Sequence, residues 1–310
     1  MRHPGLIVVW LAAPLLAVGA EPSVSIEKTS RAYIGKVDGE PAVAYRFAEV
    51  PFKPYVETLA TPSGLNVLRD SPEDHKHHHA LMFAVTVDGV NFWEEYPERN
   101  PGKQVHKGFS SPPAALREDG LVSIRLPAEK IDWNDPDGTT LLEETRSIQV
   151  QRNMKSPDGG MVLTWTSRFE VPRGKPEAVL TGSHYHGLGV RFPASMDGVG
   201  THFNAAGDLG AVYRGSERLR ETKWTAYTAP IAGKPVTVAV FDDPKNPRPA
   251  VMFTMLHGFA YISATLDLEK RPLTIEAAGP LTLRYGVVAW DGEKSPPEVE
   301  AAYLAWIAAL

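Results

Sequence analysis

Short apolar runs separated by turn residues dominate the chain beyond its first twenty positions. The runs are rich in Val, Ile, Thr, Phe, Tyr and Trp. They recur at intervals of roughly 8 to 12 residues, which is typical of an all-β sandwich or barrel. In the run 281–286, Leu, Leu and Tyr alternate with Thr, Arg and Gly, as in a strand with one buried face. The pattern therefore predicts an all-β protein built as a large β-sandwich.

The turn residues between these runs set the expected strand boundaries. Asp38-Gly39 and Asp88-Gly89 match the chemistry of tight hairpins between adjacent runs. The segments 96–120 and 173–187 are interpreted as unusually long loops that rim a functional site. The expected strands lie within 23–34, 42–48, 55–61, 65–70, 80–87, 89–93, 121–127, 141–151, 161–171, 187–192, 223–229, 236–242, 250–256, 259–266, 273–277 and 281–290.

A helical pattern appears only at the C-terminus. Ser295 is expected as the N-cap, followed by two prolines in the first turn. Val299, Ala302, Tyr303 and Trp306 then share one face, so we expect this short C-terminal helix to pack on the sandwich. No internal repeat or compositional break divides the chain, and we expect a single domain from residue 21 to residue 310.

The N-terminus has the features of an export signal. A short basic start leads into an apolar run from Leu6 to Val18, and small residues precede Glu21. The apolar run is about 13 residues long, whereas a bilayer-spanning helix needs roughly 20. We therefore expect residues 1–20 to be a cleaved signal peptide and the mature protein to be periplasmic or extracellular. Beyond the signal, no segment is long and apolar enough to predict a membrane span.

Charge and cysteine content narrow the possible partners. The formal net charge is -5 and the sequence pI is about 6.1, which gives no basic surface for nucleic acid. The chain has no cysteine. An exported chain of this kind has neither disulfides nor thiolate ligands, so any metal ion must be held by His, Asp or Glu.

A dense histidine cluster is the main candidate for chemistry. His75, His77, His78 and His79 occupy four of five consecutive positions just before an apolar run. A neutral imidazole acts as a metal ligand, a general base or a polar sugar contact. The alternative is a polar loop whose rings bond to backbone and to nearby carboxylates. The density of the cluster and the strand expected to anchor it favour a functional role.

The spacing of the cluster also bears on metal binding. If the segment is extended, His75, His77 and His79 point to one face and His78 to the other. Two rings at i and i+2 can share an ion, so His75 and His77 are the metal candidates, with zinc, copper or calcium as the ion. The end Cα atoms of such a strand are about 13 Å apart, too far for three rings to reach one ion. We therefore expect weak or substrate-assisted metal binding, and no cofactor is certain.

Other residues can contribute to a binding surface. His184 and His186 repeat the i, i+2 spacing. Arg191 and Arg248 belong to strongly patterned segments, and an arginine on an inner strand face needs either an acidic partner or an anionic ligand. Trp93 and Trp224 are candidate platforms for the apolar faces of sugar rings. The other residues considered are Asp74, Glu143, Arg191, Asn246 and Arg248.

The segment "TPSGLNVLRDSPEDHKHHHALMFAVTVDGVNFWEE" resembles the signature of the PmoA-like family, a family of unknown function also designated DUF6807. Further matches are "LLEETRSIQV", "GLGVRF", "DDPKNPRPAVMF" and "LRYGVVAWDG", so the resemblance covers most of residues 45–292. The family pattern usually continues with Arg-Gly where this chain has His79 and Ala80. The shared positions are Thr61, Pro62, Gly64, Asp74, His75, His77, His78, Glu143, Arg191, Asn246, Pro247 and Arg248.

This resemblance implies a large β-supersandwich similar to galactose mutarotase-like folds, and it implies work on carbohydrate. The inherited methane oxygenase label is not adopted, because such a membrane subunit needs several spanning helices. We therefore expect a carbohydrate-active enzyme that uses histidine and carboxylate acid–base chemistry for hydrolysis, elimination or epimerisation. The alternatives are a non-catalytic glycan-binding module and a copper enzyme with histidine ligands. The expected catalytic residues are His75, His77, His78, Asp74, Glu143 and Arg191, and the expected substrate-binding residues are His79, His184, His186, Trp93, Trp224, Asn246 and Arg248.

Overall fold

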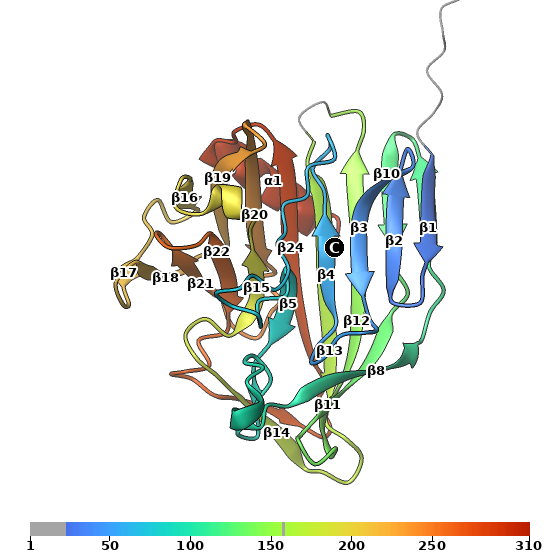
Figure 1. Ribbon diagram of the computed structural model, residues 1–310, viewed down its shortest axis with the longest axis vertical. Coiled ribbons are helices and arrows are strands. Elements are labelled where there is room, and N and C mark those ends of the chain that lie inside the picture. Colours follow the sequence, from blue (N-terminus) through green and yellow to red (C-terminus); the bar gives the residue numbers. More distant parts are fainter. Residues whose placement is uncertain (1–22, 157–158) are drawn as a thin grey trace, which may run out of the picture.

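Two ten-stranded antiparallel sheets face each other, and the main apolar core lies between them (Figure 1). The computed structural model describes residues 23–156 and 159–310, so the expected signal segment 1–20 lies outside the described residues. The all-β sandwich with one short C-terminal helix is confirmed. Among the described residues, no helix combines the length and apolar character needed to cross a bilayer.

The first sheet carries the strands that frame the histidine cluster. Its strand order is β1 (Val24–Lys28), β2 (Ala32–Val37), β3 (Glu40–Arg46), β4 (Tyr55–Leu59), β5 (Leu81–Ala84), β15 (Gly187–Arg191), β22 (Tyr261–Thr265), β21 (Val251–Met255), β18 (Glu217–Glu221) and β17 (Ala211–Val212).

The second sheet contains the longest strands. Its strand order is β16 (Thr201–Asn204), β19 (Trp224–Ile231), β20 (Lys234–Asp242), β24 (Leu281–Asp291), β13 (Met161–Glu170), β12 (Thr140–Asn153), β10 (Leu121–Arg125) and β9 (Ala114–Glu118), with β11 (Glu129–Asn134) paired to β12 and β8 (Lys103–Phe109) paired to β11. A smaller sheet follows the order β23 (Leu273–Glu276), β14 (Glu177–Thr181), β6 (Thr86–Val87) and β7 (Val90–Asn91), and two short 3-10 turns are η1 (Pro97–Arg99) and η2 (Ala194–Met196).

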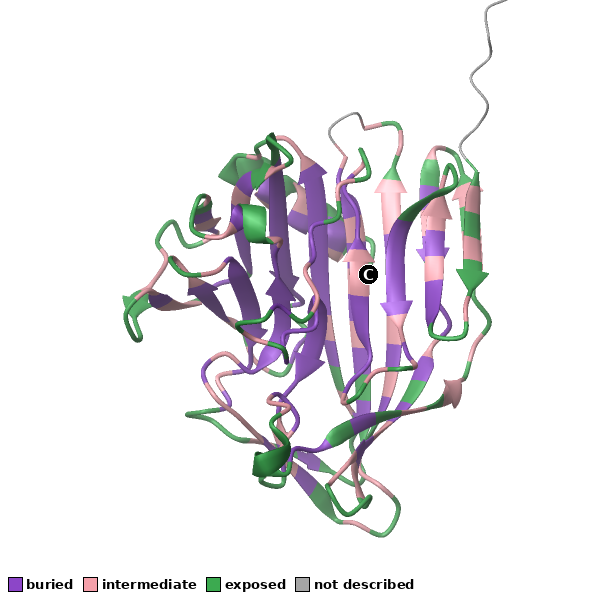
Figure 2. Ribbon diagram, in the orientation of Figure 1, coloured by how far each residue is buried: buried purple, intermediate pink, exposed green. Residues whose placement is uncertain are grey.

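The period-two pattern explains how the sheets pack. Along β12, every second residue is buried, namely Leu142, Glu144, Arg146, Ile148 and Val150, while the residues between them are more exposed. The two sheets approach closely, because a side chain at Gly35 on β2 would collide with Ile124 on β10. Figure 2 shows the result, with burial concentrated on the middle strands of the sandwich and exposure at the loops and edges.

A second, smaller core lies on the outer face of the second sheet, where the C-terminal helix α1 (Pro296–Ala308) packs. The Glu298 carboxylate accepts a hydrogen bond from the Ser295 backbone N–H at 2.8 Å, which forms the expected cap. Trp306 contacts Phe241 of β20 and donates its indole N–H to Thr164 of β13 at 3.0 Å. The helix therefore covers one face of β20 and β24, so both faces of these strands are buried.

Several expected boundaries need correction. The segment 96–120, interpreted as a long loop, contains β8 and β9, and the segment 173–187 contains β14. The run 65–70 forms only isolated bridges, because its backbone turns back toward β4 instead of pairing along a sheet. The two hairpin turns are confirmed, and Asp38, Gly39, Asp88 and Gly89 all adopt positive φ.

Candidate functional site

The histidine loop, defined here as residues 70–79, folds into two tight turns between β4 and β5. Its ends pair through an isolated antiparallel bridge between Asp70 and His79. Inside the loop, the backbone N–H groups of His75 and His78 each close a turn by donating to the carbonyl three residues earlier. The extended conformation considered for the four histidines is therefore wrong, because turn hydrogen bonds replace strand pairing.

The turns bring three imidazole rings together. The ring centroids of His75 and His78 are 4.7 Å apart and stacked, and those of His77 and His78 are 4.6 Å apart. His77 and His78 are buried, and His75 is half-buried. All three rings line one cavity of about 390 Å³, which we call the histidine cavity. A cavity of this volume is within the usual range for small-molecule sites.

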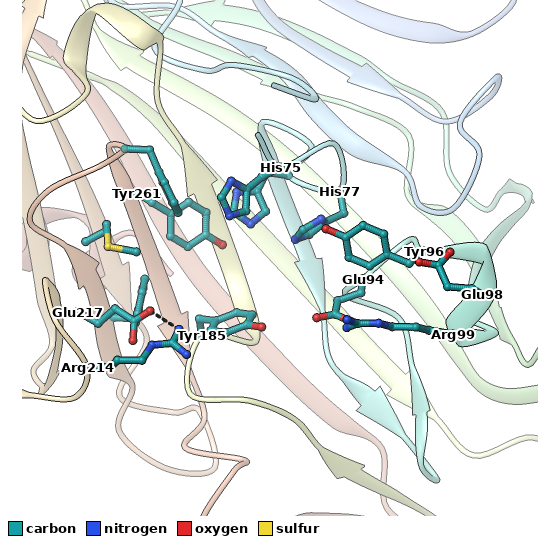
Figure 3. A pocket seen from close by; sticks show the side chains of 14 residues that line it. His75, His77, Glu94, Tyr96, Glu98, Arg99, Tyr185, Arg214, Glu217 and Tyr261 are labelled. Carbon is teal, nitrogen blue, oxygen red and sulfur yellow. Dashed lines mark hydrogen bonds and ion pairs between the residues drawn. The ribbon is translucent and has the colours of Figure 1, made fainter. Parts of the chain in front are cut away.

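The histidine cavity combines aromatic and charged walls from distant parts of the chain. Figure 3 shows His75 and His77 on one side, and Tyr185, Glu217 and Arg214 on the other. The complete lining is His75, His77, His78, Glu94, Tyr96, Glu98, Arg99, Tyr185, Arg214, Glu217, Phe253, Met255, Phe259 and Tyr261.

A hydrogen-bonded chain orients His75 at the edge of this cavity. Its Nδ1 lies 3.0 Å from Asp74 Oδ2, and the Arg191 Nη2 group donates to the same oxygen at 3.1 Å. Burial alone would raise the pKa of Asp74, but the His75 hydrogen bond and the Arg191 charge outweigh it and lower that pKa. Because the ionised carboxylate only accepts hydrogen bonds, Nδ1 of His75 carries the proton, and Nε2 of the neutral ring is left with a lone pair.

The other two cavity histidines are held in the neutral form. Burial lowers the pKa of His77 to about 4, with the charge of Lys53 acting in the same direction. Burial also places the pKa of His78 well below its ordinary value. The His78 ring stacks on Tyr261, with centroids 5.0 Å apart. Near neutral pH these rings therefore present uncharged hydrogen-bonding groups and no positive charge.

The fourth histidine supports the loop from behind. His79 Nδ1 lies 2.7 Å from Asp70 Oδ1, and Nε2 lies 3.0 Å from both oxygens of Glu95. Burial alone would lower the pKa of His79, but the two carboxylate hydrogen bonds raise it. The buried Lys53 ammonium also pairs with Glu95. Tyr55 donates to Asp70 at 2.7 Å and stacks on the His79 ring. His79 therefore braces the histidine loop through its two carboxylate partners and does not line the cavity.

The opposite wall carries carboxylates that are each tied to an arginine. Glu217 on β18 accepts from Arg214 Nη2 at 2.7 Å and from His184 Nε2 at 3.2 Å. Glu94 pairs with Arg99. Burial raises the pKa of Tyr185, and the negative charges of Glu94 and Glu217 add to this effect. Tyr185 therefore lies within electrostatic range of both carboxylates and stays protonated near neutral pH.

Several expected site residues lie away from the histidine cavity. Glu143 is exposed on β12, where it lines a separate hollow, and the inward carboxylate of that strand is Glu144. Asn246 is buried, where it accepts from and donates to the backbone of Arg284, and Arg248 donates to backbone carbonyls in 266–272. These three residues therefore have surface or loop-bracing positions.

The two tryptophans expected as sugar platforms are buried. Trp93 is 0% exposed and stacks on the His186 ring, with centroids 5.1 Å apart. Trp224 is 1% exposed beneath α1 and donates to Glu300 at 2.7 Å. Neither presents a free ring face to a ligand, because Trp93 packs into the main core just after β7 and Trp224, the first residue of β19, packs into the smaller core. His186 is also buried and does not line the histidine cavity.

The aromatic and acidic groups that line the cavity were largely missed from the sequence. Tyr185 lies between the two histidines that were noticed, and Glu217 belongs to a short charged strand without an apolar pattern. Tyr96 directly precedes η1 and Arg99 is its last residue, inside a segment interpreted as a loop. The i, i+2 spacing of His184 and His186 was the one available signal for this wall.

The structure also bears on the metal candidates. Within residues 23–156 and 159–310, no group of three or more His, Asp or Glu side chains has an arrangement that could hold a metal ion. His75 and His77 have ring centroids 5.7 Å apart. A two-histidine site for zinc, copper or calcium stays a prediction.

Acidification is expected to destabilise the protein through its buried neutral histidines. Burial lowers the pKa of His186 to about 3. The unfolded chain therefore binds this proton below about pH 6.5, whereas the folded chain binds it only near pH 3. This difference removes about 2 kcal/mol of stability by pH 5. His186→Phe keeps an aromatic ring against Trp93 and removes the titration. Urea unfolding at pH 7 and pH 5 should show a flatter pH dependence for this variant, and an unchanged slope would contradict the assignment.

Comparison with known proteins identifies a family and a distant set of structures. The family described as "Family of unknown function (DUF6807)" matches residues 35–304. A comparison with curated protein sequences found no match.

Among solved structures, the GH36 α-galactosidase AgaB from Geobacillus stearothermophilus is similar at a TM-score of 0.49 and 12% identity, over 88% of this chain and 41% of that chain. The α-galactosidase from Lactobacillus brevis has a TM-score of 0.42 and 8% identity, over 87% of this chain and 39% of that chain. A polysaccharide lyase, BACCELL_00875, has a TM-score of 0.35 and 11% identity, over 92% of this chain and 34% of that chain. This chain thus spans well under half the length of these structures.

Proposed function

Because the chain belongs to the DUF6807 family, whose function is unknown, we propose from its own geometry that the histidine cavity binds a sugar and performs acid–base chemistry on it. The observation that carries the proposal is the chain of hydrogen bonds from Arg191 through Asp74 to His75. These hydrogen bonds fix the tautomer of the His75 imidazole at the edge of a concave, partly aromatic site. Glycosidic hydrolysis, elimination and epimerisation all need a proton-transfer group of this kind.

Each histidine has a distinct proposed role. His75 takes or gives a proton through Nε2, with its partially exposed ring free to contact substrate. His77 and His78, held neutral by burial, hydrogen-bond to sugar hydroxyls without adding charge. Glu217 and Glu94 lie across the cavity and offer a second group for acid–base work or for orienting hydroxyls. Arg191 acts through Asp74 and is a positioning residue.

The aromatic wall supports a sugar as the ligand. Tyr96, Tyr185, Phe253, Phe259 and Tyr261 all line the cavity. Aromatic faces pack against the apolar faces of sugar rings, while polar groups beside them satisfy the hydroxyls. A tyrosine-rich wall opposite imidazoles and carboxylates provides both kinds of contact. We propose in addition that the mature chain works outside the cytoplasm, as its N-terminal sequence predicts.

The test is a screen for turnover and binding on the same purified protein. Oligosaccharides and glycosides of varied composition are incubated with the chain, products are followed by chromatography, and binding is measured by calorimetry. We expect product formation from at least one glycan that also binds. Binding with no product from any bound glycan, and no epimer by NMR, would instead favour a glycan-binding module. Absence of both turnover and binding would overturn the proposal.

A further inference from the structure

Every cation in and behind the wall of the histidine cavity has a carboxylate partner. On the wall, Arg214 pairs with Glu217 at 2.7 Å, and Arg99 pairs with Glu94. Just outside the lining, the same pattern holds for Arg191 with Asp74 and for Lys53 with Glu95. Within the part of the chain that the structure describes, no unpaired lysine or arginine lines this cavity.

The two buried histidines of the lining add no positive charge near neutral pH. His77 and His78 are buried and carry no proton on their second nitrogen at pH 7. His79, whose pKa is raised, faces Asp70 and Glu95, away from the cavity lining. His75 lies 3.0 Å from the Asp74 carboxylate, so it is also paired with a carboxylate. The cavity therefore has donors and acceptors for hydroxyl groups but no free positive charge that a substrate anion can neutralise.

The remaining unmatched charge is negative. Glu98 lines the cavity beside Arg99, but Arg99 pairs with Glu94. The lining holds the carboxylates of Glu94, Glu98 and Glu217 against the two guanidinium groups of Arg99 and Arg214. A ligand anion that enters this cavity loses hydration and is repelled by the lining carboxylates. Its binding is therefore unfavourable unless a cation compensates the charge.

From this arrangement we infer that the histidine cavity takes an uncharged sugar residue and discriminates against sugar acids such as uronates. The inference rests on the proposed function and adds the substrate class. The aromatic wall and neutral imidazoles recognise ring faces and hydroxyls, and the paired carboxylates exclude a substrate carboxylate. Specificity here comes from a repulsive element as well as from attractive contacts.

The pairing of Glu94 with Arg99 provides a direct test. Glu94→Gln removes the carboxylate and leaves the Arg99 guanidinium, which lies 5.1 Å from the Tyr96 ring centre, without its partner. Glu98→Gln is the matched control, because it removes the same charge from the same lining without freeing Arg99. Calorimetry at pH 7 compares methyl glucoside and methyl galactoside with their uronate counterparts, methyl glucuronide and methyl galacturonide.

We expect the wild type to bind a neutral glycoside at least about tenfold more tightly than its uronate counterpart. Glu94→Gln should narrow this ratio by about three- to tenfold, mainly through tighter uronate binding, and Glu98→Gln should change it less. If the wild type binds a uronate as tightly as its neutral counterpart, the inference about substrate class is wrong, but the proposed sugar site is not contradicted. An unchanged ratio in Glu94→Gln also overturns it. Failure of all four glycosides to bind counts against the sugar site and thus against the proposed function.

Discussion

Replacing His75 with glutamine is expected to lower kcat on the sugar substrate by about 10²- to 10⁴-fold, the usual contribution of a positioned proton-transfer group. Glutamine keeps the polarity and approximate size of the side chain but has no group that titrates near neutral pH. The hydrogen bond from His75 to Asp74 fixes the imidazole ring. Replacing His75 therefore removes only the last residue in the series of hydrogen bonds that runs from Arg191 through Asp74. Steady-state kinetics on the substrate found in the glycan screen will measure the effect.

The controls separate chemistry from folding. Lys76 is the next residue in the histidine loop, and its side chain is 73% exposed, so Lys76→Gln should leave kcat unchanged. Asp74→Asn should lower kcat less than His75→Gln, because it weakens the orientation and proton affinity of a ring that is still present. Thermal unfolding of all three variants should stay close to the wild type. Full activity in His75→Gln would remove His75 from the mechanism.

The two walls of the cavity differ in how they can adjust to a ligand. The histidine wall is held in place by His79, whose two ring nitrogens both hydrogen-bond to carboxylates. The opposite wall places Arg99 and Arg214 at the surface, with side chains 61% and 71% exposed. We therefore expect the imidazoles to set the geometry of proton transfer, while the exposed arginines hold their carboxylates in place without closing the cavity.

Strands with a strict alternation of buried and exposed residues were predictable from the sequence. β12 and β13 pair side by side, and each shows the pattern because one face meets the core. β24 alternates only as far as Tyr285 and is buried on both faces beyond it. β8 and β18 were missed because their sequences, KQVHKGF and ERLRE, are mostly polar. Such strands form because neighbouring strands supply hydrogen bonds, which a local pattern does not report.

The candidate site was predictable only where residues are adjacent in sequence. The histidine loop was singled out because four imidazoles lie close together in the chain, although its turns were not foreseen. Glu217 could not be identified, because its partner His184 lies 33 residues away in the chain. Trp93 was assigned to the surface, although the fold buries it against His186. The PmoA-like designation, unlike family membership, stays a prediction from the quoted motifs.

The buried charge pair on β12 makes the second large effect predictable. Arg146 and Glu144 are both inside the sandwich, and the arginine Nε and Nη2 groups each donate to Glu144 at 2.8 Å. Nη1 donates to the Pro54 carbonyl at 2.9 Å, and Nη2 also donates to Gln104 at 2.9 Å. This bonding satisfies the guanidinium group within the core and links the two sheets, since Pro54 directly precedes β4.

Replacing Arg146 with methionine is therefore expected to destabilise the protein by about 3–5 kcal/mol, because Glu144 is left as an uncompensated buried charge. Urea unfolding at pH 7 will measure the change. The double variant Arg146→Met with Glu144→Leu should recover much of the loss, since both charges are then absent and apolar groups fill the space.

The matched control is Arg168→Met on β13, whose partner Glu170 is solvent-exposed and whose loss should cost less than about 1 kcal/mol. If Arg146→Met is no more harmful than Arg168→Met, the buried pair does not contribute as its geometry indicates. If the double variant is as unstable as Arg146→Met, the loss comes from packing and backbone contacts of Arg146, because an isolated Glu144 charge is no longer present to explain it.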